Sequence, residues 1–178
     1  MFTEQQLRVI EYCAEEVRRQ QDTPYHVYHM LNAWDYADAL YLPPNYQPPH
    51  QIDLDFIETI GKLVDPVDNV NGFRTIRIGV GNGFEWIEKS PPDRVVPLLE
   101  ILIESYYEGM FEKDAEYPYG LYRSGIAESP EDIFYYEFEQ IHPFVDGNGR
   151  TGKILYNYLR GTLLDPQWPP NFWGVSNP

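Results

Sequence analysis

A short stretch near the carboxyl end of the chain brings together residue types that suit phosphate chemistry. Residues 141–153 read Ile-His-Pro-Phe-Val-Asp-Gly-Asn-Gly-Arg-Thr-Gly-Lys, with helical patterns on either side. The backbone N–H groups of a glycine-rich turn that opens a helix form an anion-binding nest, and the helix dipole adds partial positive charge. Arg150 and Lys153 lie on one face of the first helical turn, so both can reach a polyphosphate bound there.

Two further side chains complete this chemistry. Asp146 is a hard oxygen ligand beside the phosphate nest, where a Mg²⁺ ion would be bound. His142 stands at the end of the preceding helical pattern and could accept a proton from an attacking hydroxyl. The stretch therefore predicts a general base, a metal ligand and a phosphate-binding turn within one loop.

Two common glycine motifs also match part of this stretch but lack their structural context. Gly147, Gly149 and Gly152 satisfy the dinucleotide pattern G-x-G-x-x-G, which needs a preceding strand and a surrounding βαβ unit. A helical pattern precedes them here instead. Residues 147–153 satisfy most of a P-loop, but Ile154 stands where the Mg²⁺-binding Ser or Thr belongs. Both readings are therefore disfavoured.

The loop resembles, residue for residue, the signature of the Fic family of nucleotidyl transferases. The matching segment runs from His142 to Arg150 and reads His-Pro-Phe-x-Asp-Gly-Asn-Gly-Arg. A hairpin pattern followed by Pro-Pro at 91–92 and Val-Pro at 96–97 resembles the family's flap and the helix after it. The best-matching core spans about residues 53–164, and a proline-rich tail follows over 165–178. The resemblance implies one Fic-type domain over residues 1–178, all-α and mainly helical with one small β-hairpin flap.

The resemblance also implies a role for each site residue. In the family, the motif histidine activates the hydroxyl of a target protein, and the motif acid holds Mg²⁺ on the nucleotide; these correspond to His142 and Asp146. The glycine-rich turn and the arginine hold the phosphates, while the flap aligns an extended target segment by strand pairing. The corresponding nucleotide-binding positions are Gly147, Asn148, Gly149, Arg150, Lys153 and Asn157, and the flap positions are Thr75, Ile76, Arg77 and Ile78.

These roles imply a protein adenylyltransferase that transfers AMP from Mg·ATP to a Ser, Thr or Tyr hydroxyl of a target protein. ATP and Mg²⁺ are the expected cofactors, and the target is the expected partner. Two alternatives use the same residues: a Doc-type phosphotransferase, and a catalytically silent nucleotide-binding interaction module. The presence of both His142 and Asp146 argues against the silent module.

The chain departs from the family pattern at two places. Lys153 stands where the family has a second arginine, and lysine lacks the planar fork that binds phosphate or carboxylate bidentately. Many members also carry Ser/Thr-x-x-x-Glu-Gly/Asn, whose glutamate pairs with that arginine and blocks the productive nucleotide pose. The nearest match here ends at Glu108 but has Glu104 in place of the Ser or Thr. The sequence therefore predicts a chain that is unlocked or restrained by a separate inhibitory partner.

Helical periodicity dominates the elements that must position the loop. A capping-box pattern at Thr3 and Gln6 and the helix start at Ser129-Pro130 are the strongest local signals. One hairpin is expected from the alternating residues at 73–78 and 84–87. Helices are expected over residues 3–19, 25–40, 53–64, 95–110 and 129–141, and around 154–159.

Charged residues outside the loop are interpreted as solvent-exposed. Glu15 and Glu16 are expected on a solvated face of the first helix. Arg74 and Arg77 are three apart, so a regular strand would point them to opposite faces. A contact between one of them and a target or nucleotide is open, with a solvated position at least as well supported.

Composition narrows the function classes further. The 178 residues suit one domain, and 28 acidic against 13 basic side chains give a net charge of −15. Such a charge disfavours duplex nucleic acid and anionic membranes as partners. The first residues lack the basic and apolar segments of a secretory signal, and the apolar stretch 95–103 is too short to span a bilayer. The sequence therefore predicts a soluble, cytoplasmic protein without nucleic-acid or membrane partners.

Overall fold

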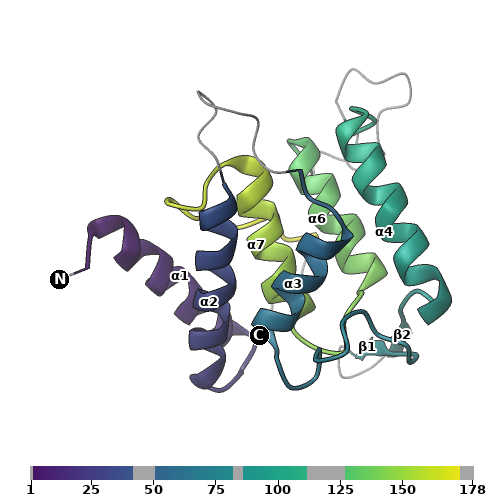
Figure 1. Ribbon diagram of the computed structural model, residues 1–178, viewed down its shortest axis with the longest axis horizontal. Helices are drawn as coiled ribbons and strands as arrows, with labels where there is room; N and C mark the ends of the chain where they lie inside the picture. Colours follow the sequence, from purple (N-terminus) through teal and green to yellow (C-terminus); the bar gives the residue numbers. More distant parts are fainter. Residues whose placement is uncertain (1, 42–50, 82–85, 112–126, 173–178) are drawn as a thin grey trace.

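The computed structural model describes residues 2–41, 51–81, 86–111 and 127–172. Within these ranges the chain is mainly helical, with one small antiparallel sheet, which confirms the expected fold class (Figure 1). The elements are α1 (Glu4–Arg19), α2 (Tyr25–Leu40), α3 (Leu54–Val64), β1 (Gly79–Gly81), β2 (Trp86–Glu88), α4 (Pro92–Tyr107), α6 (Pro130–Ile141) and α7 (Asn148–Arg160).

Helix α7 lies at the centre of the bundle. It contacts α2, α3 and α6, while α1 packs on α2 and α4 packs on α6 (Figure 1). Every residue of α7 from Arg150 to Tyr158 is buried. A helix that is buried on all sides brings its polar residues into the core, where burial is costly unless they find partners. The partners of Arg150 and Lys153 therefore decide what the predicted phosphate-binding turn can do.

Local sequence signals set most helix ends. Thr3 and Gln6 form the expected capping box at the start of α1, and Ser129 and Asp132 form one at the start of α6. Each box pairs the first backbone N–H groups of its helix with side-chain oxygens. Helix α4 begins at Pro92 and ends at Tyr107, so it starts and ends three residues before the expected range of 95–110.

The hairpin forms later in the chain than the alternation predicts. Strand β1 covers residues 79–81 and pairs with β2 in the register Gly79–Glu88, Val80–Ile87 and Gly81–Trp86. The predicted first strand at 73–78 is wrong, because this segment bonds to the signature loop instead: the Arg74 N–H donates to the Pro143 carbonyl at 2.9 Å. Of the predicted second strand, residues 84 and 85 lie outside the described residues.

The described part of the proline-rich tail, residues 165–172, forms neither helix nor strand, as expected. It lies against α1 and α7 through hydrogen bonds from Tyr12 Oη and Asn157 Nδ2 to the Gln167 carbonyl, both at 3.1 Å. Among the described helices, none combines the length and the hydropathy that a membrane span requires.

Candidate active site

His142 stands at the junction between α6 and the signature loop. Its backbone is left-handed, with φ 54° and ψ 65°, and its N–H still bonds to the Phe138 carbonyl at 2.9 Å. A left-handed residue other than glycine carries strain of about 1–3 kcal/mol, and such strain gathers at functional sites. The conformation turns the chain out of α6 directly at the predicted base.

The surroundings of His142 keep its ring uncharged. Burial lowers the pKa of His142 to about 4, and the nearby positive charges of Lys89 and Arg74 act in the same direction. A bond between its Nδ1 and the Glu139 carbonyl, at 3.4 Å, opposes this shift without cancelling it. The imidazole is therefore neutral near pH 7, which is the form that can accept a proton.

Arg74 fixes the backbone on which His142 stands. Its guanidinium is buried and donates hydrogen bonds of 2.6 to 3.2 Å to four carbonyl oxygens, which belong to Ile76, Ser90, Ile141 and His142. Arg74 thus joins both sides of the hairpin to the end of α6. The expectation of a solvated or target-contacting Arg74 is wrong, because residues 73–78 form no strand that could point it outward. Arg77 is exposed and pairs with Glu88 at 2.9 Å.

Replacing Arg74 should cost stability. In Arg74→Met four carbonyl oxygens lose their donor, and each buried polar group left unpaired costs about 1–3 kcal/mol. We expect urea denaturation to show that the free energy of unfolding is lower than in wild type by at least about 1 kcal/mol. Arg77→Met removes only an exposed ion pair, usually worth about 0–1 kcal/mol, and serves as the control. Equal losses in the two variants would contradict this role for Arg74.

The turn between Asp146 and α7 is formed by a glycine in the left-handed conformation. Gly147 has a positive φ of 72° at the N-cap of α7, and a Cβ there would lie 2.7 Å from Val64 Cγ1. Both the conformation and the space favour glycine. The Asn148 side chain bonds both ways to the Phe144 backbone, at 2.8 and 3.0 Å, so it shapes the loop from within.

Asn69 is a loop residue that no pattern in the sequence singles out. Its amide nitrogen donates to the carbonyls of Gly61 and Asp146, at 3.0 and 2.9 Å, and its oxygen accepts from the Asp146 N–H at 3.4 Å. A single buried asparagine in a turn offers no pattern that would reveal a partner so distant in sequence. Asn69 thus fixes the backbone of the predicted metal ligand.

Arg150 is fully buried at the first turn of α7, and three carboxylates lie beside one of its nitrogens. Its Nη2 lies 3.2 Å from Asp22 Oδ2, 3.3 Å from Asp146 Oδ2 and 3.6 Å from Asp65 Oδ2. Its Nε and Nη1 are buried with no hydrogen-bond partner among the described residues. Buried donors are rarely left unpaired, so these two nitrogens are suited to an anionic ligand.

Three carboxylates stand together where the predicted metal would be bound. Asp65, Asp68 and Asp146 each present an oxygen, and these oxygens lie within 4.8 Å of one another. Hard oxygen donors of this kind suit Mg²⁺, which is usually bound by one or two carboxylates together with substrate phosphates. The donor set therefore fits Asp146 as a metal ligand and adds Asp65 and Asp68, which the sequence did not single out.

Lys153 has an internal acidic partner. Its Nζ lies 2.8 Å from Glu16 Oε1, and both side chains are buried. The expectation that Glu16 faces solvent is wrong; only Glu15 lies at the surface, paired with Arg18 and Arg19. Adjacent helical residues point about 100° apart, so one of two neighbouring glutamates can face the core.

The carboxyl end of α1 covers the first turn of α7. A Cβ on Gly149 would lie 2.5 Å from Gln20 Nε2 and 3.7 Å from Glu16 Oε1. Gln20 in turn donates to Glu16. A carboxylate near a helix N-terminus interacts favourably with the partial positive charge there, as a phosphate would. Glu16 therefore lies where it can compete with a bound phosphate for the same positive end.

The remaining predicted residues lie on the periphery of this loop. Asn157 is buried one turn beyond Lys153, and its side chain bonds to Thr162, Gln167 and the Lys153 carbonyl. Thr75, Ile76 and Arg77 are exposed and Ile78 is half-buried, in the segment between the loop contact of Arg74 and β1. Roles in nucleotide or target binding stay predictions for these residues.

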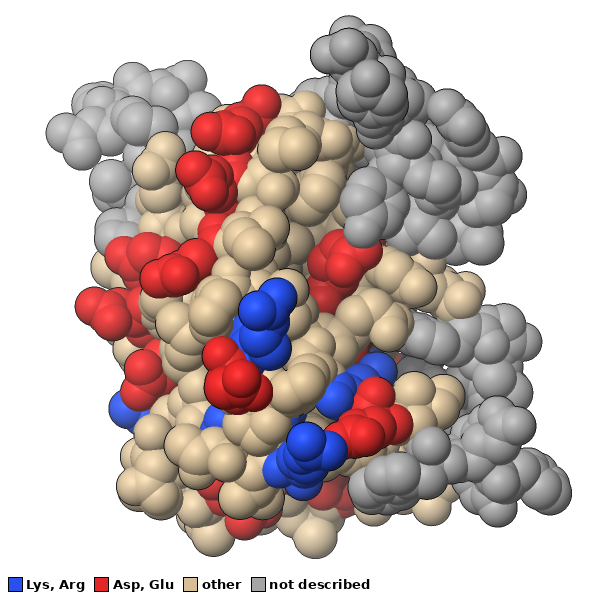
Figure 2. Space-filling view, turned by 90° about the vertical axis from the view of Figure 1, so that its right-hand side faces the viewer, with Lys and Arg blue, Asp and Glu red and all other residues tan. Residues whose placement is uncertain are grey.

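Basic and acidic side chains are distributed differently over the surface. On the side that faces right in Figure 1, the basic side chains gather in the lower half, at the level of the hairpin, while acidic ones are widely spread (Figure 2).

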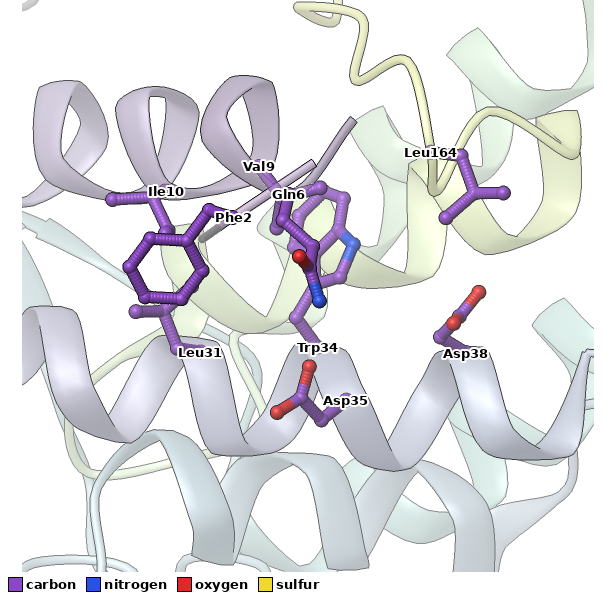
Figure 3. Close-up of a pocket in the computed structure, with 9 residues that line it drawn as sticks. All are labelled: Phe2, Gln6, Val9, Ile10, Leu31, Trp34, Asp35, Asp38 and Leu164. Atoms are coloured by element: carbon purple, nitrogen blue, oxygen red, sulfur yellow. The ribbon is translucent and has the colours of Figure 1, made fainter. Parts of the chain in front are cut away.

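A mostly apolar cavity of about 290 Å³ lies between α1 and α2, with Trp34, Asp35 and Asp38 among its lining residues (Figure 3). None of the predicted site residues lines it.

Comparisons with known proteins agree with the motif and with the fold. Residues 132–159 match the model of the Fic/DOC family. "Protein adenylyltransferase Fic" from Drosophila willistoni is 29% identical over 118 residues, which is 65% of this chain and 20% of that protein. The solved structure of Fic-1 from C. elegans superposes with a TM-score of 0.54 at 23% identity, covering 82% of this chain and 37% of that one. A variant of the same protein gives 0.53 at 22% identity, with the same coverage.

The chain thus spans a minor part of each of these relatives. The solved structures share its fold, and the family match covers most of α6, the signature loop and nearly all of α7. His142, Asp146 and Arg150 all stand inside the matched segment. In its signature loop and the two helices that flank it, the chain is thus similar to proteins of the Fic/DOC family.

Proposed function

We propose that this chain is a protein adenylyltransferase that transfers AMP from Mg·ATP to a hydroxyl side chain of a target protein. The observation that carries the proposal is that one glycine-rich loop has an uncharged His142 at one end and Arg150, with two unpaired donors, at the other. The match to the Fic/DOC family model supports a Fic-type transferase, and the name of the Drosophila willistoni relative favours adenylyl transfer among the possible groups.

The reaction follows from these positions. The phosphates of ATP would bind the N-terminus of α7 and the guanidinium of Arg150. The target hydroxyl oxygen attacks the α-phosphorus, His142 accepts the hydroxyl proton, and the bond to the departing pyrophosphate breaks. Asp146, with Asp65 and Asp68, would hold Mg²⁺, which neutralises phosphate charge when bound. Arg150 and the backbone N–H groups stabilise the charge that develops, usually the largest contribution to such catalysis.

Labelled ATP tests the transferred group directly. The protein is incubated with Mg²⁺, a cell lysate and ATP labelled with ³²P at either the α or the γ position. Label from the α position alone is the expected result. Label from the γ position alone would make the chain a phosphotransferase, an alternative for which the lysine at 153 leaves room. Binding of ATP without any label from either position would overturn the proposal in favour of a silent module.

Asp146→Asn should weaken the dependence on metal. The variant removes one carboxylate from the predicted metal site, so we expect the Mg²⁺ concentration for half-maximal transfer to rise about tenfold, equivalent to about 1.4 kcal/mol. Asp55→Asn, at an exposed position of α3, is the control and should leave the titration unchanged. An unchanged metal titration for Asp146→Asn would remove Asp146 from the metal site.

We propose in addition that α1 restrains this activity. The Glu16–Lys153 ion pair holds the end of α1 over the first turn of α7, where the phosphates would bind. Asp22, just beyond α1, pairs with Arg150 at 3.2 Å. Both cationic side chains that face the predicted nucleotide are therefore engaged by internal carboxylates, and ATP must displace them.

A further inference from the structure

Glu139 is a buried acid that the reaction above does not use. It lies on α6 three residues before His142, and its Oε2 is 3.9 Å from His142 Nδ1. Its Oε1 is buried and has no hydrogen-bond partner in the part of the chain that the structure describes. Its backbone carbonyl lies 3.4 Å from the same Nδ1. Both groups of Glu139 thus face one nitrogen of the predicted base.

The neighbouring helix leaves room for this carboxyl group. A Cβ on Gly152 of α7 would lie 3.0 Å from Glu139 Oε1, which is closer than nearly all real contacts of a Cβ. Lys89, just after β2, donates to the Glu139 carbonyl at 3.1 Å and so fixes the backbone at this point. The carboxyl group is therefore enclosed by α6, α7 and the end of the hairpin, next to His142.

The groups that face Glu139 set its charge. Burial raises the pKa of Glu139 to about 7, and Glu16 on α1 acts in the same direction, while Lys153 and Lys89 oppose the shift. The other titratable neighbours are Tyr135, whose own pKa is raised well above its usual range by burial, and His142. Arg74 is near His142 and lowers the pKa of its ring. Glu139 therefore changes charge in the range where enzymes of this kind are assayed.

We propose that Glu139 is a positioning residue for His142: it holds the Nδ1 edge of the ring and stabilises the imidazolium that forms when the ring takes the hydroxyl proton. Both neighbours of Nδ1 on Glu139 are acceptors once the carboxyl is ionised, so Nδ1 carries the ring proton and Nε2 is left to receive another. The inference rests on the proposed function, because it assigns a partner to the base of that reaction.

The charge state of Glu139 gives the inference a pH dependence of definite sign. Below about pH 7 the carboxyl group is protonated and offers no charge to the imidazolium. Above that pH it is a carboxylate, while His142, with a pKa near 4, stays neutral and ready to accept a proton. Transfer should therefore rise as the pH rises through about 7, with the base itself uncharged throughout.

The pH profile of transfer tests this directly. Wild type should show the rise near pH 7, and Glu139→Gln, which keeps the size of the side chain, should lose it. At pH 8 we expect kcat to fall about 10- to 100-fold with an unchanged KM for ATP, the scale on which hydrogen-bond partners of metal-ligating histidines act. Glu139→Asp keeps the charge and should recover part of the rate. Glu137→Gln, pointing about 200° away around the same helix, should behave as wild type.

Histidine NMR provides a readout that needs no activity. In wild type, the ¹⁵N shifts of the His142 ring should show a step near pH 7 in addition to the ring's own titration, and the step should vanish in Glu139→Gln. Identical His142 titration curves in the two proteins would overturn the inference. A step in wild type together with an inactive protein would support the positioning of the ring and overturn the proposed function instead. Loss of rate in Glu139→Gln with the rise near pH 7 intact would reduce Glu139 to a structural role.

Discussion

His142→Ala is expected to abolish transfer while ATP binding persists. The imidazole is neutral near pH 7 and stands where the signature loop leaves α6. General-base catalysis typically contributes about 10²- to 10⁴-fold, so kcat should fall by that order. The nucleotide should still bind, because its predicted contacts are the N-terminus of α7 and Arg150. Calorimetry with ATP and the α-labelling assay measure the two effects separately.

Two companion variants separate chemistry from backbone effects. His142 is left-handed, and alanine tolerates that conformation poorly, whereas glycine adopts it freely. His142→Gly should therefore unfold at a higher urea concentration than His142→Ala, while both are inactive. Gln140→Ala, at a half-buried position two residues earlier, should retain activity. Transfer near the wild-type rate in either His142 variant would remove this residue as the base.

The features that the sequence predicts well are those encoded by neighbouring residues. The capping boxes at Thr3 and Ser129 involve side chains that bond to backbone three residues away, so their patterns predict where α1 and α6 begin. The signature loop is equally local, because its glycines, acid and arginine all lie within one turn and the start of one helix. Chemistry carried by a continuous segment can be recognised before any tertiary structure is known.

The features that escaped prediction depend on contacts between distant segments. Arg74 belongs to an alternating pattern typical of a strand, but bonds to the loop and to the end of α6 replace strand pairing there. Glu16 stands beside Glu15 in a charged helix, and its burial depends on how α1 packs over α7. Glu139 looks like an ordinary polar position of α6, and its importance follows from the space left by Gly152. In each case the partner lies far away in the sequence.

Glu16→Gln is expected to make the protein more active and less stable at the same time. Removing one member of a buried ion pair leaves Lys153 without a compensating charge, which typically costs about 3–5 kcal/mol of stability. The same change releases the end of α1 from the first turn of α7 and removes a carboxylate that competes with phosphate. Typical coupling energies of this kind correspond to about 5- to 150-fold, so we expect transfer to rise and the Kd for ATP to fall within that range.

A rise in activity together with a loss of stability distinguishes restraint by α1 from simple structural support. A residue that only stabilises the fold would lower both when it is replaced, and that outcome would contradict the restraint by α1. Glu15→Gln is the matched control, since its pairs with Arg18 and Arg19 are exposed to solvent and contribute little to stability. Asp22→Asn tests the second internal carboxylate: it should tighten ATP binding through Arg150 and leave the Glu16–Lys153 pair intact. If both α1-side carboxylates compete with the nucleotide, combining Glu16→Gln with Asp22→Asn should tighten ATP binding further than either change alone, because each variant frees a different cation of α7.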